Sequence, residues 1–544
     1  MYLSKRSAKY SLASVGLTLI ATTMWHTGVS ANIESEVGLR TSIVATDGRS
    51  DGTRRINGET TALNINPSIL LSYQGPIASA VWNIDHSYIY QDIDATDRST
   101  ERSFTEYNFD SNVNIIDNYL QFSYNSQLRF RNTDPSQVFA NDFISGSDSL
   151  SRIRTNSASL QFVTPNPRWV AINWQLSGAK VESDRNINSE RNLDNNNLAT
   201  FFTLRQGEEF RRVRWAVNNQ WQKTEGNRTR GDITSRSVAG ELSVGLFSKV
   251  SLITNVQDER NQYSNTITND SAGSREFTSY GAGLEWYASD NRRISVQYNE
   301  TESDDAEQDN ESFISFDVIW AFSQRTRLEA SYGRRFFGEA GDFLFVYNTR
   351  HLRLSASYNE ELTTFTRLVS NFENLGVFVC PVGSNQASDC FLPNTLAYEL
   401  QPDEQFNAFF QNIPEISEEL ILRRTGSLNF GFETRKVTVS TSIGGGVTEF
   451  LETDREQNNL TASVNIDYRV GVKTSIFSNN NFNRTDFVDR DDRNDVIRAD
   501  LGIRHSWSRH LSTSTEISYI DRDSDNESNQ YQERRLTLAL DYQF

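Results

Sequence analysis

The chain has 544 residues, of which 37% are hydrophobic and 23% charged, with a formal net charge of −18. This negative charge argues against nucleic acid as a partner. The mean hydropathy is −0.57, and no stretch after the N-terminus approaches the roughly 20 apolar residues of a membrane-spanning helix. A transmembrane β-barrel would also have a low mean hydropathy and no long apolar stretch, because only alternate residues of each strand face lipid.

The N-terminus has the pattern of a secretory signal peptide. Lys5, Arg6 and Lys9 precede the apolar stretch from Ser11 to Met24. Small residues at Val29 and Ala31 predict cleavage after Ala31. Residues 1–31 hold three positive charges and no negative one, so their removal would take the net charge from −18 to −21. The alternative is a short membrane anchor, but no stop-transfer pattern follows.

From Ile33 onward, segments of about ten residues alternate apolar with polar side chains, which is typical of strands with two different faces. The first runs from Ile33 to Ala45, and the next two flank the turn Gln74–Gly75–Pro76. Ten further short turns follow, at 116–118, 165–167, near 207, and at 247–249, 289–291, 323–325, 348–350, 434–435, 469–471 and 508–509. One strand on each side of every turn, plus the first and last, gives about 24 strands.

Longer polar links separate the hairpins, so short turns and long links alternate along the chain. This alternation is typical of outer-membrane barrels, which have short periplasmic turns and long outer loops. The longer links expected are Thr46–Gly58, Gln91–Arg102, Asn132–Ser151, Asp258–Arg275, Thr301–Glu311, Asn483–Asn494 and Asp521–Gln532. Aromatic residues gather near the expected strand ends, as in an interfacial girdle. The opposite strand faces are polar and would line a wet lumen, as at Arg154 and Asn156, Asn173 and Gln175, Arg212 and Arg214, and Gln297 and Asn299.

The last eleven residues, Arg534 to Phe544, place Leu536, Leu538, Leu540, Tyr542 and Phe544 on one face. The pattern resembles the closing strand of bacterial outer-membrane barrels. That resemblance implies that Leu540, Tyr542 and Phe544 form an assembly signal read by the barrel-assembly machinery. Taken alone, the same residues would also suit a half-buried edge strand of a soluble β-protein. The whole pattern predicts an all-β fold: one large antiparallel transmembrane β-barrel over residues 32–544, without an N-terminal plug domain.

The link from Asn359 to Glu418 is longer than any other and contains Cys380 and Cys390. In an exported chain this pair predicts one disulfide, and a metal site would need more ligands nearby. Because the link carries apolar residues of its own, we expect an ordered lid or constriction (residues 359–418), with a mobile outer loop as the alternative.

No constellation predicts catalysis, so we expect a protein that is not an enzyme and needs no cofactor. His86, His351, His505 and His510 fall at strand surfaces or turns, without a nucleophile beside them on the same face. Three acidic runs, 302–311, 489–495 and 521–529, could bind calcium, but they lack the spacing of a calcium-binding loop and suit solvated loop charge better.

The run Phe343–Thr364 (FLFVYNTRHLRLSASYNEELTT) resembles a motif of outer-membrane proteins associated with the PEP-CTERM/exosortase system. The residues that carry the resemblance are Arg350, His351, Leu352, Leu354, Ser357, Tyr358, Glu360, Thr363 and Thr364. The run Leu422–Val439 is also similar. The resemblance implies a Gram-negative outer-membrane protein working with exopolysaccharide export or with the anchoring of sorted proteins.

We therefore interpret the chain as a porin-like conduit for polysaccharide or other solutes. Its expected partners are outer-membrane lipid and lipopolysaccharide, the barrel-assembly machinery, exopolysaccharide and periplasmic export components. The alternative is a non-conducting structural or surface-receptor barrel that presents acidic loops.

Overall fold

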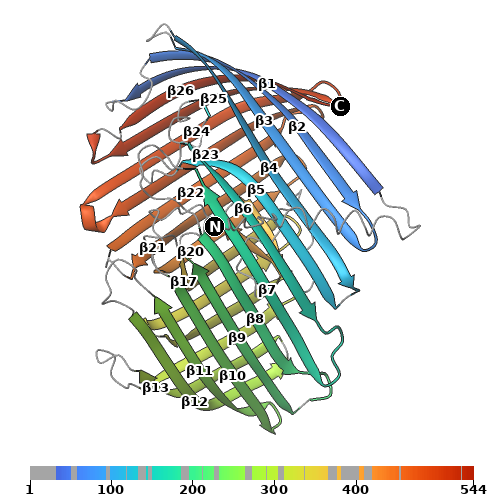
Figure 1. Cartoon of the computed structure of the whole chain (residues 1–544), viewed down its shortest axis with the longest axis vertical. Coiled ribbons are helices and arrows are strands. Elements are labelled where there is room, and N and C mark those ends of the chain that lie inside the picture. Colours follow the sequence, from blue (N-terminus) through green and yellow to red (C-terminus); the bar gives the residue numbers. More distant parts are fainter. Residues whose placement is uncertain are drawn as a thin grey trace, which may run out of the picture.

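The computed structural model is one closed antiparallel β-barrel of 24 strands (Figure 1). It confirms the fold class and strand number expected from the sequence. The structure describes residues 32–50, 58–93, 98–117, 119–132, 143–144, 150–184, 195–210, 212–225, 232–263, 273–289, 291–303, 312–335, 337–364, 376–381, 404–409, 420–451, 455–527 and 530–544. The expected signal peptide, residues 1–31, lies outside them.

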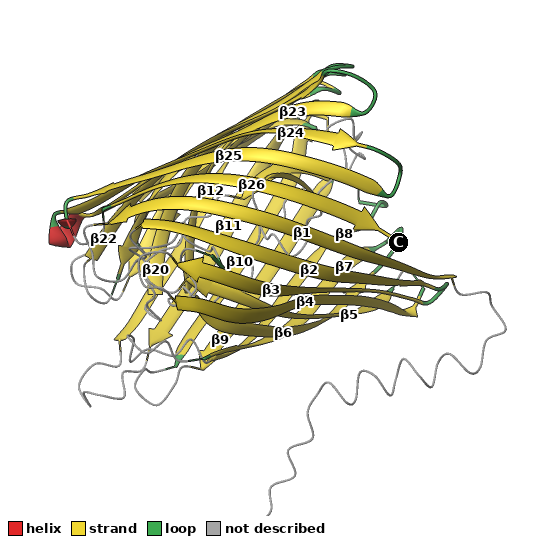
Figure 2. Cartoon of the chain, turned by 90° about the horizontal axis from the view of Figure 1, so that it is seen from above, coloured by secondary structure: helices red, strands yellow, loops and turns green. Residues whose placement is uncertain are grey.

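Each barrel strand pairs with its neighbours in the chain, and the cylinder closes where the last strand pairs with the first. Figure 2 shows β25, β26, β1 and β2 side by side at this seam. The first half of the barrel consists of β1 (Asn32–Ser50), β2 (Gly58–Gln74), β3 (Ala78–Ile93), β4 (Arg98–Ile116), β5 (Leu120–Asn132), β6 (Leu150–Val163), β7 (Val170–Ser183), β8 (Asn195–Gln206), β9 (Val213–Glu225), β10 (Ile233–Phe247), β11 (Val250–Tyr263) and β12 (Gly273–Ser289).

The second half consists of β13 (Arg292–Ser303), β14 (Ser312–Ser323), β15 (Thr326–Arg335), β16 (Gly338–Asn348), β17 (Leu352–Thr364), β20 (Leu420–Glu433), β21 (Val437–Phe450), β22 (Arg455–Arg469), β23 (Thr474–Phe487), β24 (Asp492–Ser506), β25 (Leu511–Ser524) and β26 (Tyr531–Gln543). A short 3-10 helix, η5 (Val488–Arg490), joins β23 to β24.

The strands are longer than the sequence pattern predicts, and the links are shorter. β1 continues to Ser50, and β11 continues to Tyr263, through residues expected to be loop. The reason is that ladder hydrogen bonds continue above the lipid, where both faces meet water and the apolar alternation disappears. The expected alternation of short inner and long outer links also fails in places. Only residues 336 and 337 join β15 to β16, and the outer links 94–97 and 451–454 are shorter than the inner link 164–169.

The outer surface carries the apolar belt of a membrane-spanning barrel. On β24, for example, Ile497, Leu501 and Ile503 are 47%, 57% and 52% exposed. Exposed aromatics gather beside the short turns, namely Trp169, Phe210, Phe247, Trp286, Phe322, Trp507 and Phe544. A second set lies farther along the strands, namely Tyr88, Tyr90, Tyr280, Tyr298, Tyr358 and Tyr519. A closed barrel with an apolar exterior of this kind lies in the outer membrane of a Gram-negative bacterium.

The long link between β17 and β20 contains two strands that do not belong to the barrel. β18 (Gly376–Pro381) pairs with β19 (Glu404–Phe409) in a separate two-stranded sheet. Part of this link is therefore ordered by its own backbone hydrogen bonds. Over the residues that the structure describes, no helix is long and apolar enough to cross a membrane.

The sheet bends sharply at one end of the barrel, around β11–β15, at the bottom of Figure 1. Arg335 on β15 donates from Nη2 to Glu259 Oε1 on β11 at 2.8 Å. Four inter-strand steps, about 19 Å along the sheet, separate these strands. An Arg–Glu pair cannot span that length over a gently curved wall, so β11 and β15 face one another across a tight corner.

Candidate functional site: the barrel lumen

Contacts between strands that are not neighbours identify the inner face of the barrel. Arg214 on β9 forms an ion pair with Glu285 on β12, although β10 and β11 lie between them. Such a contact is possible only across the concave side of a sheet, so Arg214 and Glu285 face the lumen. The inward positions of every other strand follow from the pairing register, because residues directly opposite each other share a face.

Charged side chains are concentrated at the corner. Glu285 is 1% exposed, and its Oε2 accepts a hydrogen bond from Ser243 Oγ at 2.7 Å. Arg214 donates to the same Ser243 hydroxyl at 2.8 Å, and its guanidinium lies 3.7 Å from the centroid of the Tyr287 ring. Arg214 and Glu285 thus each have a counter-charge and a hydrogen bond, as burial of charge requires. We infer that this ionic corner stabilises the bend of the sheet.

Arg335→Gln is expected to destabilise the barrel by about 1–3 kcal/mol, because it leaves the Glu259 carboxylate buried without its counter-charge. The Glu259 side chain is 2% exposed and that of Arg335 is 30% exposed, so solvent reduces the effect from the cost of a fully buried pair. Urea unfolding in lipid vesicles measures the free energy. The double variant Glu259→Gln/Arg335→Gln should recover most of the loss, and equal losses in both variants would contradict the role of the pair.

Away from the corner, the inner wall is mostly uncharged and able to form hydrogen bonds. Ser442 on β21 and Ser463 on β22 face inward, and their hydroxyl oxygens are 2.6 Å apart. The outer faces of the same strands carry lipid-exposed Ile443 and Leu460. On the same wall, Thr461 Oγ1 donates to an amide oxygen on β23 at 2.9 Å. Other inward residues of this wall are Ser440, Asn465, Asn479, Asn481 and Asn483. Amides and hydroxyls both donate and accept hydrogen bonds, so this wall suits polar, uncharged solutes.

The prediction for Arg154 and Asn156 was wrong. Asn156 Oδ1 accepts hydrogen bonds from Tyr124 Oη at 3.2 Å and Ser126 Oγ at 2.8 Å, on the outer side of β5 and β6. Its inward neighbours are instead Thr155 and Ser157. Polar residues near the outer end of a strand stand above the lipid belt, where either face meets water, so polarity there does not indicate the lumen. The predicted inward positions Asn173, Gln175, Arg214, Gln297 and Asn299 do face the lumen.

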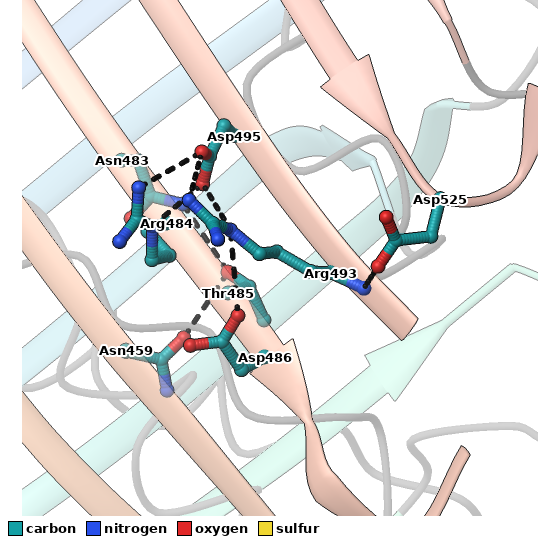
Figure 3. A network of polar contacts seen from close by, with 8 residues as sticks. All are labelled: Asn459, Asn483, Arg484, Thr485, Asp486, Arg493, Asp495 and Asp525. Carbon is teal, nitrogen blue, oxygen red and sulfur yellow. Dashed lines mark hydrogen bonds and ion pairs between the residues drawn. The ribbon is translucent and has the colours of Figure 1, made fainter. Parts of the chain in front are cut away.

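A polar network joins the outer ends of β22, β23 and β24 beside η5 (Figure 3). Arg484 donates to both carboxylate oxygens of Asp495 at 2.8 and 3.0 Å, and Arg493 donates to Asp495 Oδ2 at 2.7 Å. Asp525 Oδ2 accepts from the backbone N–H of Arg493 at 2.9 Å. The acidic run 489–495 therefore has arginine counter-charges at Asp495, whereas the run 521–529 is held here by the backbone hydrogen bond to Asp525. No group of three metal-ligating side chains occurs within the described ranges.

Two described residues between β5 and β6, Phe143 and Ile144, contact the inner wall of the first strands. Ile144 is 6% exposed and packs with Val44, Ala62 and Ile89, all on inward positions. The Phe143 ring stacks on inward-facing Phe104, with centroids 4.4 Å apart. These two residues therefore narrow the lumen beside β1–β4, which the sequence pattern did not predict. The sequence indicates such a contact only by placing two adjacent apolar residues, Phe143 and Ile144, inside a mostly polar link.

The predicted disulfide partner Cys390 lies outside the described residues, while the backbone of Cys380 pairs with Gln405 in β18–β19. The disulfide therefore stays a prediction. In the predicted assembly signal, Leu540, Tyr542 and Phe544 are 43%, 38% and 68% exposed on the outer surface of the seam. Their position suits recognition during assembly, which also stays a prediction.

The four described histidines hold structural positions. The Nδ1 atoms of His351 and His510 lie 2.9 and 3.0 Å from the carbonyl oxygens of Glu433 and Gln543 in neighbouring strands. Those of His86 and His505 lie 2.8 Å from threonine hydroxyls. None of these contacts pairs a histidine with both a nucleophile and a carboxylate.

No family model and no curated protein matches the chain. Similar solved structures include the copper transporter OprC, at 11% identity over 94% of this chain and 81% of that chain, with a TM-score of 0.41. The siderophore receptor PirA from Acinetobacter baumannii is 9% identical over 94% and 81%, with a TM-score of 0.40. The ferric-catecholate import receptor Fiu from E. coli K12 is 9% identical over 94% and 82%, with a TM-score of 0.41. Likeness at this level carries no inference about what the lumen passes.

Proposed function

We propose that this outer-membrane barrel is a conduit for a hydroxyl-rich polymer, with exopolysaccharide of a PEP-CTERM/exosortase-type export system as its cargo. The observation that carries the proposal is the uncharged amide and hydroxyl wall on β21–β23. Twenty-four strands about 4.8 Å apart and tilted by about 40° give a perimeter of about 150 Å, which side chains alone cannot fill. A sugar chain would exchange hydrogen bonds with water for equivalent bonds with these side chains.

Purified protein in planar lipid bilayers is expected to conduct ions. The double variant Phe143→Ala/Ile144→Ala is expected to raise the single-channel conductance, because the segment that narrows the lumen loses its apolar contacts with Phe104 and Ile89. Val217→Ala, an exposed apolar substitution on the outer surface, is the control and should leave the conductance unchanged. A barrel that is silent both before and after the double substitution would contradict a conduit.

The inward-folded segment also favours a second candidate, a non-conducting structural or surface-receptor barrel that presents acidic loops. The arginine–aspartate network at the outer rim would then hold the loops in place for a partner. Absence of conductance together with calcium-dependent protection of the loops from protease would support this candidate.

Removal of residues 382–403 tests separately whether the 359–418 link acts as the predicted lid. If it does, the removal should increase the conductance.

A further inference from the structure

Phe201 is an exposed aromatic side chain on the lumen wall. It lies on β8, is 37% exposed, and stands directly opposite Gln175 on β7 and Gln220 on β9. Gln220 shares its face of β9 with Arg214, which reaches Glu285 across the concave side. Phe201 therefore faces the lumen, while the next residue, Phe202, faces outward. The three strands lie side by side at the front of the barrel in Figure 1.

The ring stands within a row of amides. Gln175 is opposite Gln161 on β6, and Gln161 is opposite Gln121 on β5, so four glutamines and Phe201 form one cross-strand row. The inward residues around Phe201 on β7–β9 are mostly short, which leaves the ring standing above them. They are Asn173, Ser177, Ala199, Thr203, Asn218 and Gln222.

The inward residues of β7–β9 within two positions of Phe201, counted along the paired strands, include no ionisable side chain. An acidic polymer would find no counter-charge here. A purely apolar ligand would cover the glutamine amides without satisfying their hydrogen bonds, which is unfavourable. A sugar ring meets both requirements, because its C–H face packs on an aromatic ring while its hydroxyls bond to flanking amides.

We propose that Phe201 and the flanking Gln175 and Gln220 form a binding subsite for an uncharged pyranose unit on the lumen wall. The subsite deepens the proposed conduit function and rests on it for its place along a polymer's path. The aromatic face supplies the contact area, and the two amides on opposite sides of the ring orient the sugar. Asn218, which is exposed and accepts a hydrogen bond from Thr203 Oγ1 at 2.9 Å, extends the polar surface along β9.

Calorimetric titration of the detergent-solubilised full chain tests the subsite with maltohexaose and cellohexaose as neutral probes and hexagalacturonate as the acidic one. At least one neutral probe is expected to bind more tightly than the acidic probe. Phe201→Leu keeps an apolar side chain without the aromatic face and should weaken that binding roughly tenfold. Phe201→Trp should retain it. Phe202→Ala removes the adjacent outward ring and should leave it unchanged.

Equal affinity in Phe201→Leu and the original chain would overturn the proposal, as would absence of neutral-probe binding or preference for hexagalacturonate. Bilayer conductance of the same proteins separates this outcome from failure of the conduit. Conductance without Phe201-dependent binding would reject the subsite alone. Phe201-dependent binding without conductance would reject the conduit and leave a sugar-binding receptor.

Discussion

Deletion of Tyr531–Phe544 is expected to abolish the folded barrel. These residues include β26, which pairs with β25 on one side and closes the cylinder against β1 on the other, from Gly38↔Gln543 to Ser50↔Tyr531. Without them, two strand edges would expose unpaired N–H and C=O groups to hydrocarbon, at several kcal/mol for each group. Gel electrophoresis without heating distinguishes the compact barrel from the unfolded chain. A compact species of the truncated chain would contradict closure through β26.

Phe544→Ala separates closure of the barrel from recognition during assembly. Alanine keeps the backbone hydrogen bond from the Phe544 N–H to Val37 O, at 2.8 Å, and loses only the ring packed 4.7 Å from Tyr542. The variant should therefore refold in lipid vesicles almost as well as the original chain. If the terminal aromatic is an assembly signal, less of the variant should reach the outer membrane in cells. Equal amounts in cells would contradict that signal.

Gly283→Ala is expected to destabilise the barrel by about 3 kcal/mol or more. Gly283 lies on the inner side of β12 at the tight corner, and an added Cβ would stand 2.0 Å from Val296 O and 2.6 Å from Gln297 Cα. Both contacts are with backbone of the paired strand β13, so the ladder itself would have to shift. Overpacking that cannot relax through a side chain costs at least the upper part of the usual 1–3 kcal/mol range. Urea unfolding in lipid vesicles measures the loss.

Gly333→Ala is the matched control on the same inner wall. A Cβ there would meet Ser315 Cβ at 3.8 Å and Phe313 Cε2 at 3.9 Å, which are ordinary van der Waals distances. The change should alter the free energy of unfolding by less than about 1 kcal/mol, and the lower backbone freedom of alanine in the unfolded chain favours stability. Similar losses at Gly283 and Gly333 would show that the corner is not as tightly packed as the structure has it.

Part of the candidate site could be predicted from the sequence. Alternation placed Asn173, Gln175, Gln297 and Asn299 on the inner wall, because a strand within lipid needs apolar residues at every second position. Alternation could not show that Phe201 faces the lumen, since two phenylalanines in succession leave the choice of face open. Only the register with Gln175 and Gln220 decides it.

The sequence by itself determined the barrel, its 24 strands and its location. Lipid on one side of each strand and water on the other require apolar and polar residues to alternate, and this two-residue period is visible in the sequence. Tertiary structure decided the extent of the strands, the corner held by Glu259 and Arg335, and the segment at Phe143 that narrows the lumen. Each of these depends on contacts between residues far apart in the chain, which a local pattern of polar and apolar residues does not specify.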